Sequence, residues 1–195
     1  MNHLPDKSTV KPIEKMVVNL VIRDSLLLVV DVQNGFVNDN SKHVLKPINK
    51  LIEHWRSNNG TIVFSRFINP ENGPWERLMG WHDCKAGSDT LLHPSLKRGD
   101  DFIISKHAYS SWQPEVSELC EKLSFDTVAL CGIDTDQCVL ISAVDIFQAG
   151  LKPLVAADCC ASSAGEKFHR AGLLLLERLV GKQQVLTSSQ LGSER

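Results

Sequence analysis

The feature that most constrains the fold of this chain is a series of five short apolar segments separated by longer stretches with helical spacing. These segments are rich in Val, Ile and Leu and cover residues 25–32, 61–68, 101–106, 127–133 and 152–159. Their apolar residues run almost continuously, which is typical of strands buried on both faces of a parallel sheet. A weaker segment, QQVLTS at 183–188, is predicted to add a sixth strand at the edge.

The stretches between these segments predict helices. Apolar side chains recur on one helical face of residues 44–58, and Gly60 follows as a helix-ending residue. Residues 114–123 show the same spacing and begin with proline, which is tolerated in the first turn of a helix. Residues 165–181 supply a further helix. Because strand and helix alternate along the chain, we expect an α/β fold with a parallel sheet and right-handed crossovers.

Length and composition place the chain among single-domain globular proteins. It has 195 residues, of which 43% are hydrophobic and 23% charged, and its net charge is -2. No basic stripe points to nucleic acid, and no apolar stretch approaches the roughly 20 residues needed to span a bilayer. A signal-peptide pattern is also absent from the N-terminal residues. We therefore expect a cytoplasmic protein that binds neither nucleic acid nor membrane.

The six cysteines are expected to be free thiols. They are irregularly spaced in a chain with a full-sized core and without a secretion signal, and no pair has the CxxC spacing of a zinc or redox site. Cys159 and Cys160 are adjacent, which allows a redox pair. Two small residues at the end of a strand are the favoured interpretation.

Three reactive side chains follow predicted strands, each at the point where its strand ends. The first strand ends in VVDVQNGF and carries Asp31, and the third ends in SKHAYSSW and carries Lys106. The fourth ends in GIDTDQC, which places Cys138 at the entrance to a helix. The carboxyl ends of parallel strands meet at one edge of a sheet, where ligands bind. The sequence therefore predicts that an acid, a base and a thiol converge there.

The position of Cys138 favours a reactive thiol over a buried one. Thr135 is predicted to be the N-cap of the helix, so that Cys138 falls in the first turn, where backbone N–H groups and the helix dipole favour a thiolate. Lys106 would add positive charge, and Asp31 could accept the thiol proton. Each residue alone fits a simpler role, as a strand-end polar group, a solvated charge or a core thiol. The combination of the three favours a nucleophilic site.

DVQNGF, the strand end at Lys106 and GIDTDQCV together resemble the signatures of the isochorismatase-like cysteine hydrolase superfamily, which includes nicotinamidases and isochorismatases. The resemblance covers about residues 25–188. It implies a three-layer Rossmann-like α/β fold with a central, mostly parallel six-stranded sheet in the order 3-2-1-4-5-6.

The same resemblance implies roles for individual residues. Asp31 would be the general base, Lys106 its cationic partner and Cys138 the nucleophile. A cis peptide bond is expected between Ile133 and Asp134, and the backbone N–H groups of Asp134 and Cys138 are expected to form an oxyanion hole.

The implied activity is hydrolysis of a C–N bond in a small amide or ureido compound through a thioester, without a cofactor. Two alternatives stay open. One is the vinyl ether hydrolysis of true isochorismatases, which lack the nucleophilic cysteine. The other is a catalytically idle or redox-sensing member of the same fold.

The segment SRFINPENGPWERLMGWHDC, residues 65–84, lacks the Asp-x-His pair of the metal site in the nicotinamidase branch, so no metal is expected. His82 and His93 are the nearest candidate ligands. Arg66, Arg77 and Asn69 are weak candidates for binding a polar substrate. The residues predicted to line the substrate pocket are Gln33, Phe36, Phe67, Trp81, Tyr109 and Trp112.

The ends of the chain are assigned separately from the hydrolase domain at 25–188. Residues 1–24 are predicted to form an N-terminal arm, and residues 189–195 a flexible tail. The resemblance also implies a homodimer or homotetramer, and the apolar stretch MVVNLVI in the arm would suit contact with a neighbouring subunit.

Overall fold

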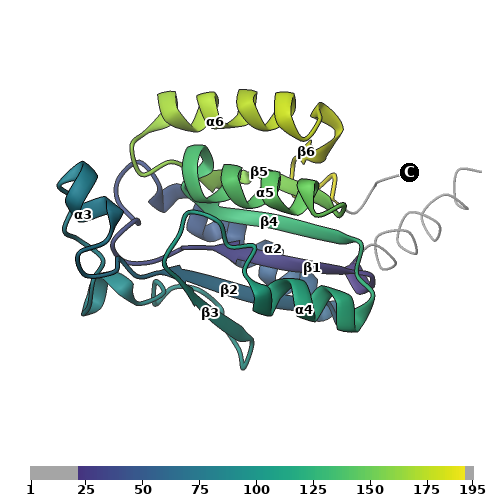
Figure 1. The fold of residues 1–195 in the computed structure, drawn as a ribbon. Helices are drawn as coiled ribbons and strands as arrows, with labels where there is room; N and C mark the ends of the chain where they lie inside the picture. Colours follow the sequence, from purple (N-terminus) through teal and green to yellow (C-terminus); the bar gives the residue numbers. More distant parts are fainter. Residues whose placement is uncertain (1–21, 192–195) are drawn as a thin grey trace, which may run out of the picture.

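A computed structural model describes residues 22–191, and a single six-stranded sheet forms its centre (Figure 1). All neighbouring strands are parallel, in the order β3-β2-β1-β4-β5-β6. The strands are β1 (Ser25–Val30), β2 (Thr61–Phe67), β3 (Phe102–Lys106), β4 (Thr127–Ile133), β5 (Lys152–Ala161) and β6 (Val185–Leu186). The predicted α/β class and strand order are confirmed, although β6 has only two residues.

Helices cover both faces of this sheet, so the fold has three layers. In Figure 1, α2 lies behind the sheet, α4 and α5 lie in front of it, and α6 lies beside α5. The helices are α2 (Leu45–Ser57), α3 (Pro74–Met79), α4 (Pro114–Leu123), α5 (Leu140–Gln148) and α6 (Glu166–Leu179). The short 3₁₀ turns are η2 (Lys42–Val44), η3 (Ser88–Thr90) and η5 (Lys182–Gln184).

The short helix α3 was not predicted from the sequence. Its six residues begin with Pro74 and end before Gly80, which adopts a left-handed conformation with φ 68°. A helix of this length spans less than two turns, and so it cannot show the periodic apolar stripe by which longer helices are identified.

The core is centred on β1, which explains the unbroken apolar run of that strand. All six of its residues are buried, because β2 and β4 flank it and helices cover both of its faces. By contrast, β3 lies at the edge of the sheet, where Phe102 is 64% exposed and Ile103 is 40% exposed. A similar apolar run therefore marks a central strand in one case and an edge strand in the other.

Two glycines allow close approaches that position the end of β4. A Cβ atom on Gly132, which has φ 131°, would lie 2.1 Å from the carbonyl oxygen of Val30 in β1. A Cβ atom on Gly172 of α6 would lie 2.8 Å from the backbone nitrogen of Asp136, just beyond β4. Glycine at these two positions lets the end of β4 pack closely against β1 and lets α6 pack against the segment that follows β4.

The limits of the domain stay predictions. Most of the predicted arm, residues 1–21, lies outside the described residues, as do residues 192–195 of the predicted tail. Ile22 and Leu191 are both buried, and the backbone N–H of Ser188 donates a hydrogen bond of 2.6 Å to Asp158 Oδ1. Within residues 22–191, no helix has both the length and the apolar character that crossing a membrane requires.

Candidate active site

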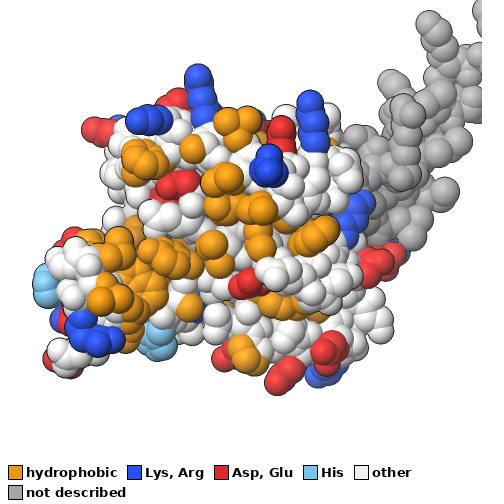
Figure 2. Space-filling view, turned by 45° about the horizontal axis from the view of Figure 1, so that its top comes forward, with side chains coloured by type: hydrophobic (Ala, Val, Ile, Leu, Met, Phe, Trp, Pro, Cys, Tyr) orange, Lys and Arg blue, Asp and Glu red, His pale blue; other side chains and the backbone are white. Residues whose placement is uncertain are grey.

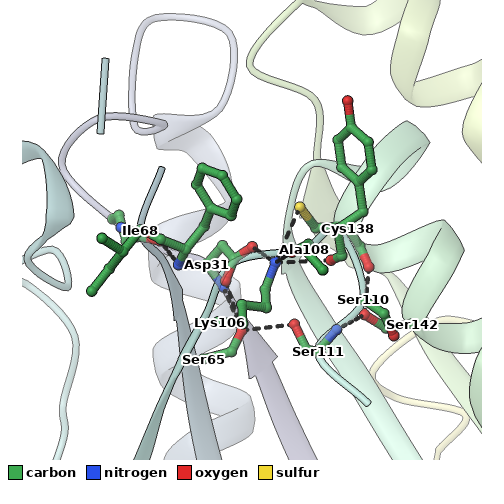
Figure 3. A network of polar contacts seen from close by, with 12 residues as sticks. Asp31, Ser65, Ile68, Lys106, Ala108, Ser110, Ser111, Cys138 and Ser142 are labelled. Atoms are coloured by element: carbon green, nitrogen blue, oxygen red, sulfur yellow. Dashed lines mark hydrogen bonds and ion pairs between the residues drawn. The ribbon is translucent and has the colours of Figure 1, made fainter. Parts of the chain in front are cut away.

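The three side chains predicted at strand ends lie together at the carboxyl edge of the sheet (Figure 3). Asp31 directly follows β1, Lys106 is the last residue of β3, and Cys138 belongs to η4 (Thr135–Val139), a π-helical turn after β4. Lys106 Nζ lies 2.7 Å from Asp31 Oδ2 and 3.5 Å from Cys138 Sγ. All three residues are buried, with exposed fractions of 0%, 1% and 7% for Asp31, Lys106 and Cys138. The cation thus bridges the acid and the thiol.

Lys106 is fixed by the loop that follows its own strand. Its Nζ donates hydrogen bonds of 2.8 Å to the carbonyl oxygens of Ala108 and Tyr109, in addition to its contacts with Asp31 and Cys138. Burial acts to lower the pKa of Lys106, but the charge of Asp31 and the contacts of Nζ with Asp31 and Cys138 outweigh burial, and the net pKa is raised. Lys106 is therefore a cation at neutral pH.

Asp31 is oriented by β2. Ser65 Oγ donates to Asp31 Oδ1 at 2.7 Å and lies 2.9 Å from Ser111 Oγ. The backbone N–H of Asp31 donates to the carbonyl oxygen of Ser65 at 3.2 Å. One carboxylate oxygen thus contacts Ser65 and the other contacts Lys106, which fixes the plane of the carboxylate.

The backbone of Cys138 is tied to the loop that holds Lys106. Ser142 Oγ donates to the carbonyl oxygen of Cys138 at 2.5 Å and accepts a hydrogen bond of 2.7 Å from the backbone N–H of Ser111. As Figure 3 shows, this chain of contacts runs from Asp31 through Ser65, Ser111 and Ser142 to Cys138.

The predicted N-cap is wrong. Asp134, not Thr135, is the N-cap residue of the turn that contains Cys138. Thr135 is buried, and its Oγ1 lies 2.8 Å from His169 Nδ1 of α6. The difference arises because a π-helical turn, rather than the first turn of an α-helix, follows β4.

The resting state of the thiol also differs from the prediction. Burial raises the pKa of Cys138 well above its usual value, and the Asp31 carboxylate raises it further. Lys106 acts in the opposite direction but does not offset these two effects. A thiolate at this position would need an open helix N-terminus, whereas Cys138 is almost fully buried close to the Asp31 carboxylate. At neutral pH the resting residue is therefore a protonated thiol.

Cys138 and Asp134 line a cavity of about 300 Å³. Four of the six residues predicted to form the pocket line it: Phe36, Phe67, Trp81 and Tyr109. Their rings pack together with Trp75 of α3, and Phe67 contacts Trp75 edge-on with ring centroids 4.8 Å apart. The aromatic residues predicted around the rim thus form one wall of the cavity.

Gln33 and Trp112 were also predicted to line the pocket, but they do not line this cavity. Gln33 is fully buried, and its side chain bonds the backbone of Phe67, accepting from the N–H at 2.6 Å and donating to the carbonyl at 2.9 Å. Trp112 packs against the main core. The contacts of Gln33 with the Phe67 backbone and of Trp112 with the main core occupy these two side chains.

Six further residues that line the cavity were not predicted from the sequence to form the pocket, namely Gly35, Trp75, Met79, Asp83, Gln137 and Ser163. The dense aromatic content of residues 65–84 was the one available signal for Trp75.

The polar candidates near this segment serve other contacts. Arg66 Nε donates to Ser105 Oγ, Arg77 Nε donates to the carbonyl oxygen of Asn72, and Asn69 Nδ2 donates to the carbonyl oxygen of Trp81. None of the three lines the cavity. The structure therefore gives no support to a carboxylate clamp built from Arg66 and Arg77.

The two candidate metal ligands lie apart from any ligand cluster. His82 Nδ1 is 3.8 Å from Glu76 Oε1, and His93 Nδ1 is 2.8 Å from Ser95 Oγ. Among residues 22–191, no three His, Cys, Asp or Glu side chains come together in a way that could hold a metal ion. The donor set therefore does not fit the metal site of the nicotinamidase branch. All six cysteines are free and buried, as predicted for free thiols.

Replacing Asp134 with Asn is expected to stabilise the protein more at high pH than at low pH. Burial raises the pKa of Asp134 from its usual 3.8 to about 6, although hydrogen bonds from Ser163 oppose the rise. The stability that this carboxyl contributes is present below pH 3.8 and lost as the pH rises through 6. At about 1.4 kcal/mol per pKa unit, ionisation costs the folded protein about 3 kcal/mol.

Asn cannot ionise, so the unfolding free energy of Asp134→Asn relative to the parent should increase by up to about 3 kcal/mol between pH 4 and pH 7.5. Urea denaturation at the two pH values measures this difference. Equal differences at both would contradict the raised pKa.

Known proteins resemble this chain in both sequence and fold. The sequence profile of the isochorismatase domain matches residues 25–189. The isochorismatase family protein YwoC of Bacillus subtilis is 24% identical over 175 residues, which covers 85% of this chain and 92% of YwoC.

Among solved structures, N-carbamoylsarcosine amidase of Thermoplasma acidophilum has a TM-score of 0.74 and 24% identity, covering 85% of this chain and 96% of that chain. The nicotinamidase PncA of Bacillus subtilis has a TM-score of 0.72 and 20% identity, covering 84% and 99%. At these identities the two structures establish a shared fold. Because the family profile spans most of the sequence, this chain belongs to the isochorismatase family.

Proposed function

We propose that this protein is a cysteine hydrolase that cleaves a C–N bond of a small amide or ureido compound through a thioester intermediate. The observation that carries the proposal is the buried Lys106 ammonium between Asp31 and Cys138, together with the place of Cys138 in the lining of the cavity. The family match supports a hydrolase, and an amidase and a nicotinamidase share the fold.

In the first half of the reaction, Asp31 accepts the proton of the Cys138 thiol as the sulfur attacks the carbonyl carbon of the substrate. A protonated resting thiol close to the Asp31 side chain suits this step, because proton transfer then accompanies attack. The tetrahedral intermediate collapses as its C–N bond breaks, and Asp31 passes the proton to the leaving nitrogen. Ammonia or an amine departs, and the acyl group stays on Cys138.

In the second half, water attacks the thioester carbon while Asp31 accepts a proton from that water. The C–S bond breaks, the acid product leaves, and the proton returns to the sulfur. Lys106 remains a cation throughout. It stabilises both the Asp31 carboxylate and the thiolate that forms transiently on Cys138.

The backbone N–H groups of Asp134 and Cys138 are assigned to the oxyanion hole. Both residues line the cavity, and the peptide bond between Ile133 and Asp134 is cis. An oxyanion donor stabilises the tetrahedral intermediate more than the ground-state carbonyl, and each donor typically contributes about 3–4 kcal/mol to catalysis.

Ammonia release from a panel of small amides and ureido compounds tests this proposal. We expect at least one compound to be hydrolysed by the parent protein, with no ammonia from a Cys138→Ser control. Activity should persist with chelator, since the donor set does not fit a metal. Hydrolysis that survives Cys138→Ser, or a protein that cleaves vinyl ethers but no amide, would overturn the proposal. Loss of activity with chelator would overturn its metal-independent form.

A further inference from the structure

The cavity beside Cys138 has a wall made almost entirely of aromatic rings. The ring of Phe36 stacks on Trp81 with centroids 6.3 Å apart, Phe67 stacks on Trp81 at 6.0 Å, and Trp75 contacts Tyr109 edge-on at 5.4 Å. Figure 2 shows hydrophobic side chains gathered at the end of the molecule where α3 lies. Such a wall binds flat apolar groups, and it also binds weakly hydrated cations, because ring faces carry negative partial charge.

The charged side chains that line the same cavity are both acidic. Asp83 and Asp134 line it, and the described residues that line it include no lysine, arginine or histidine. Lys106, the cation that contacts the thiol, is already paired with Asp31 at 2.7 Å. A bound carboxylate would face two acids with no uncompensated cation to offset them, whereas a bound cation would face two acids and an aromatic wall.

Asp83 is the more exposed of the two acids that line the cavity. Asp83 is exposed, and it follows Trp81 of the aromatic wall by two residues in the sequence. Asp134 lies deeper, at 7% exposure, and its carboxylate accepts hydrogen bonds from the backbone N–H and hydroxyl of Ser163. Of the two acids that line the cavity, Asp83 is therefore the one that a cation from solvent reaches more readily.

We propose that the substrate is a small amide whose remaining part carries a positive charge clad in apolar groups, such as an alkylated ammonium, with the cation held by the aromatic wall and Asp83. This inference rests on the proposed amide hydrolysis for its reaction, but not for its binding preference. It disfavours carboxylate-bearing compounds as substrates.

Binding is measured first, in the Cys138→Ser variant, so that it does not depend on turnover. The three ligands are γ-trimethylammoniobutyramide, its uncharged isostere with carbon in place of the quaternary nitrogen, and the anion glutaramate. By calorimetric titration at pH 8, we expect the cation to bind at least about 10-fold more tightly than the isostere. Glutaramate is expected to bind more weakly than either.

Variants separate the two parts of the proposed cation site. Asp83→Asn should lower the cation-to-isostere affinity ratio by about 3-fold. Trp81→Leu keeps an apolar wall but removes an aromatic face, and it should lower the ratio as well. Asp100→Asn is the matched control, because it removes the same charge at an exposed position before β3, at the opposite end of the sheet. It should leave the ratio unchanged.

Each outcome decides the inference. A ratio near one, tighter binding of glutaramate, or no measurable binding of the cation would overturn it. An equal loss in Asp83→Asn and Asp100→Asn would also overturn it, since the effect would then come from net charge alone. If the cation binds preferentially but the parent protein releases no ammonia from any amide, the proposed hydrolysis fails while the binding preference stands.

Discussion

Replacing Cys138 with Ser should reduce kcat/KM for the best amide substrate by roughly 10³-fold or more, with the protein still folded. The sulfur forms the proposed covalent bond to the acyl group, and a serine hydroxyl is a far weaker nucleophile in the same position. Ser is close to Cys in size, so the hydrogen bond from Ser142 to the carbonyl oxygen of residue 138 can be kept.

The predicted intermediate gives this experiment a second measurement. Acid-quenched parent protein should show, by mass spectrometry, an added acyl group on the peptide that contains Cys138, and the variant should not. Cys120→Ser is the matched control, because Cys120 is also buried but lies on α4, away from the cavity. Its turnover should stay near that of the parent. A Cys138→Ser variant within 10-fold of the parent would exclude Cys138 as the nucleophile.

Replacing Lys106 with Met is expected to cost about 3–5 kcal/mol of unfolding free energy as well as most of the activity. The variant leaves the Asp31 carboxylate buried without its cation, and it removes the donor to the carbonyl oxygens of Ala108 and Tyr109. Removing one partner of a buried ion pair is costly because the remaining charge is uncompensated.

A double-mutant cycle distinguishes this explanation from a simple packing defect. Asp31→Asn is the suitable second change, because Asn tolerates the positive φ of 48° at that position and can still accept from Ser65. In the Lys106→Met background it should recover part of the lost stability, as measured by urea denaturation.

Lys97→Met provides the reference, since Lys97 pairs with Glu53 on the surface and should contribute less than about 1 kcal/mol. Additive effects of Lys106→Met and Asp31→Asn would show that the buried pair is not coupled.

The fold was predictable because its signals are local. An unbroken apolar run, as in β1, reports a strand buried on both faces, and a helical apolar stripe, as in α2, reports a helix that packs on a sheet. The exceptions are elements for which local pattern is uninformative. The helix α3 is too short to show a period, and β3 has an apolar run although it lies at an exposed edge.

In the candidate site, the reactive residues were predictable from the sequence, whereas the pocket wall was predictable only in part. Strand ends in a parallel sheet share one edge, so the order of the elements was enough to place Asp31, Lys106 and Cys138 together, and their contacts agree with that expectation. The pocket wall depended on which side chains turn inward. Gln33 was predicted to line the pocket, but its side chain bonds the backbone of Phe67 instead.

By itself, therefore, the sequence determined the α/β architecture and the set of reactive residues at the sheet edge, because periodicity and chain order are properties of the chain alone. Only the tertiary structure decided that Cys138 rests as a protonated thiol, that Thr135 does not cap its turn, and that two acids and five aromatic residues line the cavity. The physical reason is that burial and electrostatic environment are set by segments distant in sequence. Cys138 is desolvated, and Asp83 comes to line the same cavity, only when those segments pack together.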